Sequence, residues 1–218
     1  MDRADTLDLL RGMGAADLIT PHGGGVAITY LPWVFDESAG ELGVLRSHLA
    51  RLNPHADVLA AAGEVESVVV VHGVDCYVSP RWYGPSAGER QVPTWDYVVA
   101  HVHGRVTMHN EADWLLTQIA EQVAKFESGQ PEPWTLDDAP ADYVAGMCRA
   151  IVGIELEVTR IEAKAKLSQN KSPEIVAGIV AGLRSVGDHG AADAVERANR
   201  GKQWPAMRRS LQRHEPLN

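Results

Sequence analysis

Aromatic and hydrogen-bonding side chains gather in residues 74–105 of the sequence. Two segments there, Ser79-Pro80-Arg81-Trp82-Tyr83 and Pro93-Thr94-Trp95, combine aromatic rings with hydroxyls and an arginine. Aromatic rings offer a stacking face, and Tyr hydroxyls and Trp nitrogens can form hydrogen bonds at the edge of a flat ligand. These segments predict a site for an aromatic heterocycle. An aromatic core or a dimer interface is the alternative interpretation.

A second polar cluster precedes the turn-forming pair Asn53-Pro54, where a strand is expected to lead into a short helix. It consists of Arg46, Ser47, His48 and Arg51. Hydroxyls and guanidinium groups at the end of a strand favour a phosphate site, because Arg offers forked donors that match phosphate oxygens. Surface arginines in salt bridges explain the same residues equally well.

His101 and His103 lie two residues apart on an expected strand and therefore face the same side of it. Imidazole is a common metal ligand, but no carboxylate or thiolate falls at a matching spacing, and Cys76 and Cys148 are isolated. We therefore expect no metal site, and histidines satisfied within a barrel are the preferred interpretation. Haem ligation by one of them remains open.

Lys164, Lys166 and Lys171 lie beside the amides of Gln169 and Asn170. Such donors could bind an anion or close over the edge of a ligand, and a solvated strand end is the alternative. The sequence contains no Gly-x-Ser-x-Gly, Walker or Cys-x-x-Cys motif. It therefore identifies no catalytic acid, base or nucleophile, and whether the protein is an enzyme stays open.

Periodicity predicts strands in the first three-quarters of the chain, with helices between and after them. The expected strands are 17–20, 26–30, 41–50, 65–72, 95–109 and 154–158. The expected helices are 113–126, 140–151, 173–186 and 191–200. Successive strands followed by late helices favour a mainly β, α+β fold, a small antiparallel barrel carrying helices, over repeating βαβ units.

With 218 residues and 45% hydrophobic residues, the chain can bury a sizeable core. Its formal charge of −9 disfavours nonspecific binding to nucleic acid. One basic segment, 197–213, could contact DNA or a protein partner, or it could be a solvated helix and tail. Neither a signal peptide nor a membrane-spanning stretch is recognised, so we expect a cytoplasmic protein with no membrane contact.

Five ordered motifs extend these observations. They are Tyr77-Val78-Ser79-Pro80-Arg81-Trp82-Tyr83, Val92-Pro93-Thr94-Trp95-Asp96-Tyr97, His101-Val102-His103-Gly104, Ile151-Val152-Gly153-Ile154-Glu155 and Lys166-Leu167-Ser168-Gln169-Asn170. Together they resemble the PaiB family of FMN-binding proteins, which are described as negative transcriptional regulators. The similarity extends over about residues 17–183, and Asp96 stands where the family pattern leads us to expect Asn.

The resemblance implies an FMN-binding split β-barrel with peripheral helices, comprising residues 1–170, and a helical C-terminal segment, 171–218. It also implies a homodimer with FMN at the subunit interface. The phosphate contacts would come from Ser47, His48 and Arg51. The isoalloxazine ring and ribityl chain would lie along Ser79, Arg81, Trp82, Tyr83, Pro93, Thr94 and Trp95.

The function implied by the resemblance is that of a flavoprotein regulator acting through DNA or a protein partner. A flavin-dependent reductase or oxidase is the alternative, in which the flavin performs the chemistry while the protein binds and orients. A haem-binding split barrel is a further alternative and would require a histidine such as His101 or His103 at the iron.

Overall fold

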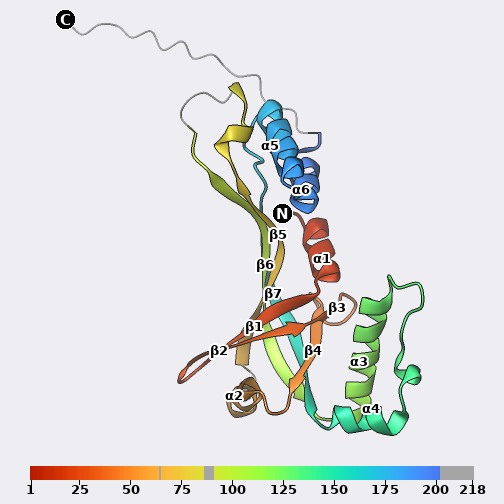
Figure 1. Cartoon of the computed structure of the whole chain (residues 1–218). Helices are drawn as coiled ribbons and strands as arrows, with labels where there is room; N and C mark the ends of the chain where they lie inside the picture. The colour runs from red at the N-terminus through yellow and green to blue at the C-terminus, as the bar shows by residue number, and fades with distance from the viewer. Residues whose placement is uncertain (64, 86–90, 202–218) are drawn as a thin grey trace, which may run out of the picture. The chain divides into compact units, whose positions relative to one another are not determined.

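The computed structural model describes residues 1–63, 65–85 and 91–201 (Figure 1). Within them, seven strands form one sheet in the order β2-β1-β5-β6-β7-β4-β3. The strands are β1 (Ala15–His22), β2 (Gly25–Pro32), β3 (Val34–Asp36), β4 (Val44–Ala50), β5 (Val65–Val78), β6 (Thr94–His109) and β7 (Ile151–Lys166).

Helices account for most of the remaining described residues. The α-helices are α1 (Arg3–Gly12), α2 (Pro54–Ala62), α3 (Ala112–Glu127), α4 (Ala141–Cys148), α5 (Pro173–Ser185) and α6 (His189–Asn199). Two short 3-10 turns are η1 (Pro80–Trp82) and η3 (Leu136–Asp138).

The chain divides into two compact units. Unit 1 contains residues 1–73 and 97–165, and unit 2 contains residues 74–96 and the chain from Lys166 onward. The long strands β5, β6 and β7 contribute to both units, so the division does not follow a single linker. Each unit is described separately below.

In unit 1, the hairpin of β1 and β2 gives the sheet two different faces. Leu18 is fully buried and its neighbour Ile19 is half-buried, as expected for a strand whose successive side chains alternate between faces. Ile19 pairs with Ile28 on β2 and with Val68 on β5. Because directly opposed residues of an antiparallel pair share a face, these three side chains form a row across three strands.

Unit 1 also contains the main hydrophobic core. Trp33, Leu45, Ile154 and Leu156 are almost completely buried in it. β4 pairs antiparallel with β7 along the full length of β4, from Val44 opposite Glu157 to Ala50 opposite Ile151. This pairing fixes the polar residues of β4 between the core and the helix α3, which contacts β4.

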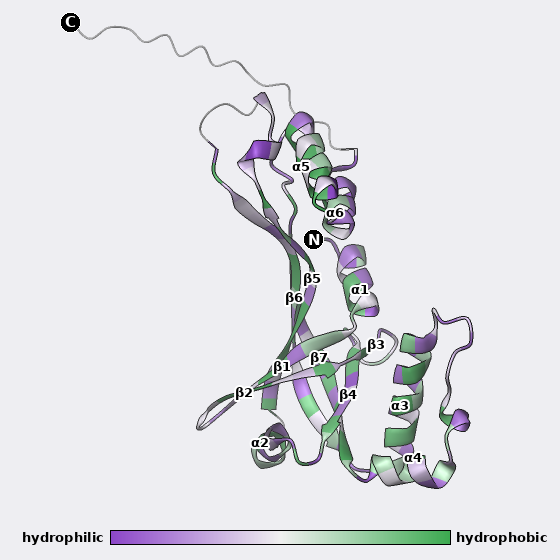
Figure 2. Ribbon diagram, in the orientation of Figure 1, coloured by the Kyte–Doolittle hydropathy of each residue, from purple (hydrophilic) through white to green (hydrophobic). Residues whose placement is uncertain are grey.

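In unit 2, the turn η1 packs closely against α5, a largely hydrophobic helix in Figure 2. Two glycines make this approach possible. A Cβ at Gly178 would lie 2.0 Å from the carbonyl oxygen of Trp82, and one at Gly182 would lie 2.3 Å from its indole ring. Larger residues at these two positions would separate η1 from α5.

The α+β class predicted from the sequence is confirmed, as are the strands at 17–20 and 26–30, which lie in the hairpin of β1 and β2, and the late helices α5 and α6. Several elements differ from expectation. The strand β3 was not predicted, β5 extends to Val78 instead of ending at 72, and α4 ends at Cys148 instead of 151. α1 was not predicted, although Asp2 caps it by accepting a hydrogen bond from Asp5 N at 2.8 Å. The strand predicted at 154–158 is the 16-residue β7. Its alternation changes phase at Thr159 and Arg160, which are both exposed, so the pattern read at 154–158 does not extend to the end of the strand. Part of the basic segment, 202–213, lies outside the described residues.

Candidate functional site

The predicted site residues fall in both units. Ser47, His48 and Arg51 belong to unit 1, and the residues of the two aromatic segments belong to unit 2.

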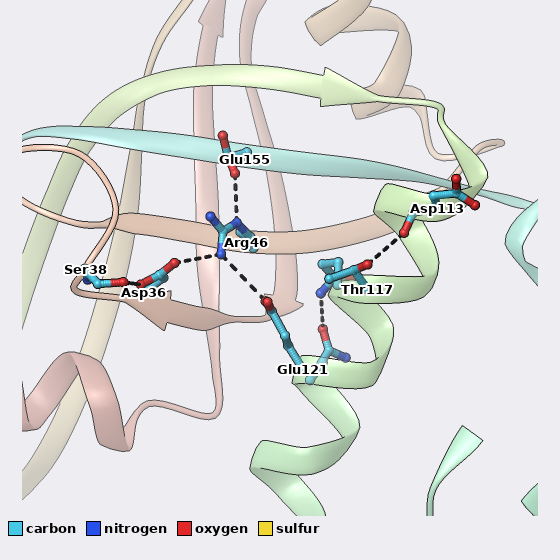
Figure 3. Close-up of polar contacts among 9 residues, drawn as sticks. Asp36, Ser38, Arg46, Asp113, Thr117, Glu121 and Glu155 are labelled. Atoms are coloured by element: carbon cyan, nitrogen blue, oxygen red, sulfur yellow. Dashed lines mark hydrogen bonds and ion pairs between the residues drawn. The ribbon is translucent and has the colours of Figure 1, made fainter. Parts of the chain in front are cut away.

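On β4, Arg46 is surrounded by carboxylates (Figure 3). Its guanidinium lies 2.9 Å from Asp36, 2.8 Å from Glu155 and 3.7 Å from Glu121. Burial opposes the charge of Arg46, but the hydrogen bonds to Glu155 and Asp36 prevail and raise its pKa. The cluster holds more acids than bases, so it does not resemble a phosphate site.

Ser47 and His48 are both engaged by the chain itself. Ser47 is fully buried and its hydroxyl donates to the carbonyl oxygen of Pro32 at 2.7 Å. His48 Nδ1 lies 2.9 Å from Gln118 Oε1, and Gln118 donates in turn to Gln122 at 3.0 Å. A ligand would have to displace the Pro32 carbonyl oxygen to receive the hydroxyl hydrogen of Ser47, whereas His48 uses only Nδ1 in its contact with Gln118.

Arg51 follows β4 and is exposed. It donates to the carbonyl oxygens of Arg149 at 3.2 Å and Ile151 at 2.8 Å, and to Asn110 Oδ1 at 2.8 Å. These bonds use three of the five N–H groups of the guanidinium. Arg51 therefore ties the end of β4 to the start of β7 and still has donors for an anion.

In unit 2, a pocket of about 320 Å³ gathers residues from two separate segments of the chain. Two predicted residues, Tyr83 and Thr94, line it. Polar residues around 166–171, which the sequence identified as a donor cluster, complete it. The full lining is Tyr83, Gln91, Val92, Thr94, Asp96, Lys166, Ser168, Gln169, Asn170 and Lys171.

A carboxylate is buried in the wall of this pocket. Asp96 is only 1% exposed, and its Oδ2 accepts a hydrogen bond from Ser168 Oγ at 2.6 Å. Its Oδ1 lies 3.5 Å from Lys166 Nζ, yet it has no hydrogen-bond partner among the described residues. Lys166 also donates to Thr94 Oγ1 at 2.5 Å and to the carbonyl oxygen of Trp95. The ammonium group of Lys166 is thus occupied by contacts within the site.

Ser168 is held in an unusual conformation. Its φ of 57° lies in the left-handed region, which non-glycine residues rarely adopt. Flanking bonds support the turn, since Leu167 N donates to Gln169 Oε1 at 2.7 Å and Asn199 Nδ2 donates to the carbonyl oxygen of Leu167 at 2.9 Å. The strained turn aims the hydroxyl of Ser168 at Asp96, and strain of this kind concentrates at binding sites.

The hydroxyl of Tyr83 is a second buried polar atom without a hydrogen-bond partner among the described residues. The side chain of Tyr83 is 1% exposed. Burial, and then the nearby charge of Asp96, raise the pKa of Tyr83. Its phenol is therefore a protonated donor at neutral pH. The Lys171 ammonium lies 4.8 Å from the centre of the Tyr83 ring and covers it.

The other predicted aromatic residues do not line this pocket. The indole of Trp82 packs on Gly182 instead, and Ser79 caps η1 by accepting from Arg81 N at 3.3 Å. Trp95 is 52% exposed and points away from Thr94 and Asp96, as alternation along β6 requires. Its indole donates to Asp75 at 2.9 Å and meets the edge of Tyr77.

Arg81 and Pro93 are exposed. No hydrogen bond from the Arg81 side chain is recorded within the described ranges.

Two histidines of β6, His103 and His109, contact other side chains of unit 1. His103 lies 3.1 Å from Arg160 and 3.4 Å from Glu162, both on β7, and His109 stacks on Trp114 with ring centres 4.0 Å apart. The described residues contain no cluster of three or more metal-ligating side chains. No helix in the described part of the chain is long and apolar enough to cross a membrane.

Comparison with known proteins gives the class of protein and the family. Residues 1–160 match the family model described as "Putative FMN-binding domain". The chain belongs to this family. The predicted relation to PaiB proteins and the predicted cofactor, FMN, are thereby confirmed.

Two curated relatives are similar over most of their length. An uncharacterized protein of Emericella nidulans is 30% identical, and the match covers 73% of this chain and 75% of that protein. "Protease synthase and sporulation protein PAI 2" of Bacillus subtilis is 28% identical, with 71% of each chain covered.

Solved structures confirm the split-barrel fold. A FAD and heme binding protein from Mycobacterium smegmatis superposes with a TM-score of 0.55 at 17% identity, covering 76% of this chain and 71% of that one. The flavocytochrome Anf3 from Azotobacter vinelandii gives a TM-score of 0.54 at 13% identity, covering 75% and 67%.

The residues of the unit 2 pocket fit a flavin. Isoalloxazine carries hydrogen-bonding groups along one edge. The pocket offers a hydroxyl and a carboxylate oxygen that are buried and have no hydrogen-bond partner among the described residues. Buried polar atoms are normally paired, so such atoms in a pocket wall indicate a polar ligand. When bound, the flavin would supply the redox chemistry, while Tyr83, Thr94 and Asp96 would hold and orient it.

Proposed function

We propose that this protein is a dimeric, FMN-binding transcriptional regulator of the PaiB type that works in the cytoplasm. The observation that carries the flavin site is the pocket beside Asp96. There the hydroxyl of Tyr83 and the Oδ1 of Asp96 are buried and have no hydrogen-bond partner among the described residues. The regulatory part of the proposal rests on the resemblance to PaiB proteins and on the relative from Bacillus subtilis.

The phosphate is proposed to contact Arg51, whose guanidinium keeps two N–H groups beyond those it donates to the chain. Ser47 and His48 lie near it in sequence and complete the predicted set, although Ser47 would have to exchange its bond to the Pro32 carbonyl oxygen for one to the phosphate. Exchange of one bond for another has a small net free energy.

An exposed apolar face in unit 1 supports the dimer. On β2, Val26, Ile28 and Tyr30 are 57%, 63% and 68% exposed. They alternate along the strand and so share one face, which Ile19 and Val68 extend across β1 and β5. Contiguous apolar surface of this kind marks an interaction site. A second copy of the chain is the proposed partner.

The decisive experiment is an FMN titration of the purified protein, followed by absorbance spectra and by release of bound cofactor on denaturation. We expect saturable binding with about one flavin per chain, and a dimer by light scattering. Retardation of promoter DNA that weakens steeply with salt would support the regulatory function, because phosphate contacts release counterions.

The same preparation tests the alternatives. Turnover of a reduced nicotinamide with bound flavin would favour a reductase. Absence of flavin binding together with a Soret band on haem addition would favour a haem protein; the Mycobacterium smegmatis structure is described as binding both FAD and heme. Absence of both would refute the cofactor site.

A further inference from the structure

We propose that the unit 2 pocket recognises the pyrimidine edge of the flavin, with Asp96 accepting the hydrogen bond of the ring N3–H. This inference rests on the proposed FMN binding and specifies which part of the cofactor the pocket holds. The pyrimidine edge presents one N–H donor between two carbonyl acceptors. A complementary site must therefore place one acceptor among donors.

The pocket has this composition. Asp96 Oδ1 is the acceptor, since its partner oxygen Oδ2 is already occupied by Ser168 at 2.6 Å. Tyr83 has a hydroxyl without a partner among the described residues and can donate to a carbonyl. Thr94 accepts from Lys166 through its oxygen, which leaves its own O–H free to donate. All three side chains line the same pocket.

The alternative occupant is a phosphate, because Lys166 and Lys171 also line the pocket. The buried charge argues against it. Asp96 is a carboxylate at 1% exposure, and a phosphate dianion beside it would meet repulsion that solvent screens poorly. Lys166 donates to Thr94 and to Trp95 and lies 3.5 Å from Asp96 Oδ1 as an ion pair, and Lys171 covers the ring of Tyr83. A neutral edge carrying an N–H suits these groups better.

The local rigidity of the site supports recognition of a specific edge. Ser168 donates to Asp96 from a backbone in the left-handed conformation, at φ 57°. Asn199 on α6 secures that turn through the carbonyl oxygen of Leu167 at 2.9 Å. The carboxylate is therefore held in one orientation before any ligand arrives, as a discriminating hydrogen-bond site requires.

The test compares flavins that differ only at N3, so that the folding of a variant does not enter. Wild-type protein is titrated with FMN and with 3-methyl-FMN, and in parallel with riboflavin and 3-methylriboflavin. We expect methylation to weaken binding by roughly tenfold or more in both pairs, as for loss of a hydrogen bond to a charged group. The ratio should not depend on the phosphate.

A second arm uses Asp96→Ala, with Asp75→Ala as the matched control, since Asp75 bonds the exposed Trp95 instead. The Asp96 variant should bind both members of each pair with similar affinity, while the control retains the preference. Equal binding of FMN and 3-methyl-FMN by the wild type would overturn this inference alone. Failure to bind FMN at all would overturn the proposed function as well. Displacement of riboflavin by inorganic phosphate would assign the pocket to an anion.

Discussion

The polar cluster on β4 and the pocket beside Asp96 use similar side chains in opposite ways. On β4, Arg46 meets carboxylates, Ser47 meets a carbonyl oxygen and His48 meets Gln118. In the pocket, Tyr83 and Asp96 each keep a buried atom without a hydrogen-bond partner in the described chain. Both regions are polar, but only the second is incomplete.

The difference distinguishes polar residues that stabilise the fold from polar residues that bind a ligand. A network whose donors and acceptors are satisfied within the chain stabilises the fold, and removing one member leaves the others unpaired. An incomplete network costs free energy until a ligand completes it. Variants in the two regions should therefore change different quantities, unfolding free energy on β4 and flavin affinity in the pocket.

The largest effect is expected from Gly178→Ala on α5. The new Cβ would lie 2.0 Å from the carbonyl oxygen of Trp82, so η1 must move and Tyr83 must move with it. Overpacking of this kind costs about 2 kcal/mol or more. We expect a lower urea midpoint and FMN affinity reduced about tenfold, ~1.4 kcal/mol, measured by flavin fluorescence.

The matched control is Gly146→Ala on α4, where the nearest atom to a new Cβ is Arg149 Nη2 at 3.5 Å. This variant should fold and bind FMN like the wild type. A folded Gly178→Ala protein with unchanged FMN affinity would break the comparison, since the position of Tyr83 would then be irrelevant to the ligand.

The second effect is expected from Arg46→Met. Its loss leaves Asp36 and Glu155, which are 29% and 27% exposed, without their shared cation. Breaking a partly buried pair should lower the unfolding free energy by about 2 kcal/mol, while FMN affinity stays the same. Arg184→Met is the control, because Arg184 also bridges two carboxylates but is 46% exposed. It should change stability little.

How far the sequence predicts these regions depends on the sequence distance between partners. The two strands of the β1–β2 hairpin and the helix α5 depend on local sequence patterns, and the sequence predicts all three. Tyr83 and Thr94 were selected for their chemistry, and both line the pocket. Lys166 was predicted only as part of a donor cluster, and Ser168 was named only within a family motif, because their contacts with Asp96 span 70 and 72 residues of sequence.

The polar residues of β4 show the complementary limit. Their types predict anion binding or salt bridges equally well, and the choice depends on neighbours that no local pattern reveals. Ser47 bonds Pro32 across 15 residues, and Arg46 bonds Glu155 across 109. Trp82 is a similar case, since only the fold places Gly182 beneath its ring.

The third effect is expected from Arg51→Ala. Arg51 bonds the chain, like the other polar residues near β4, and is also proposed to bind the ligand, like the pocket residues. Its three bonds to the chain are solvent-exposed, so their loss should lower stability by about 1 kcal/mol. If its remaining N–H groups bind the phosphate, FMN affinity should fall by about 1 to 3 kcal/mol while riboflavin affinity is unchanged. Equal loss for both flavins, or none for either, would remove Arg51 from the phosphate site.

The smallest effect is a pH dependence of the unfolding free energy that comes from His55. It tests whether every buried polar atom without a hydrogen-bond partner indicates a ligand. His55 Nδ1 pairs with Thr29 Oγ1 at 2.9 Å, while Nε2 is buried with no hydrogen-bond partner in the described chain. Burial, and then His22, lower its pKa. The unfolded chain, with a His pKa of about 6.5, therefore binds the proton more readily than the folded protein does.

Stability from His55 should be complete above pH ~6.5 and decline as the pH falls from there toward the lowered pKa of the folded state. Urea unfolding at pH 7.5 and 5.5 should show a smaller decline for His55→Gln than for wild type, with exposed His101→Gln as the control. FMN affinity should not change in His55→Gln. A flavin effect there would show that buried open atoms outside the unit 2 pocket also serve the cofactor, and the contrast between the two regions would fail.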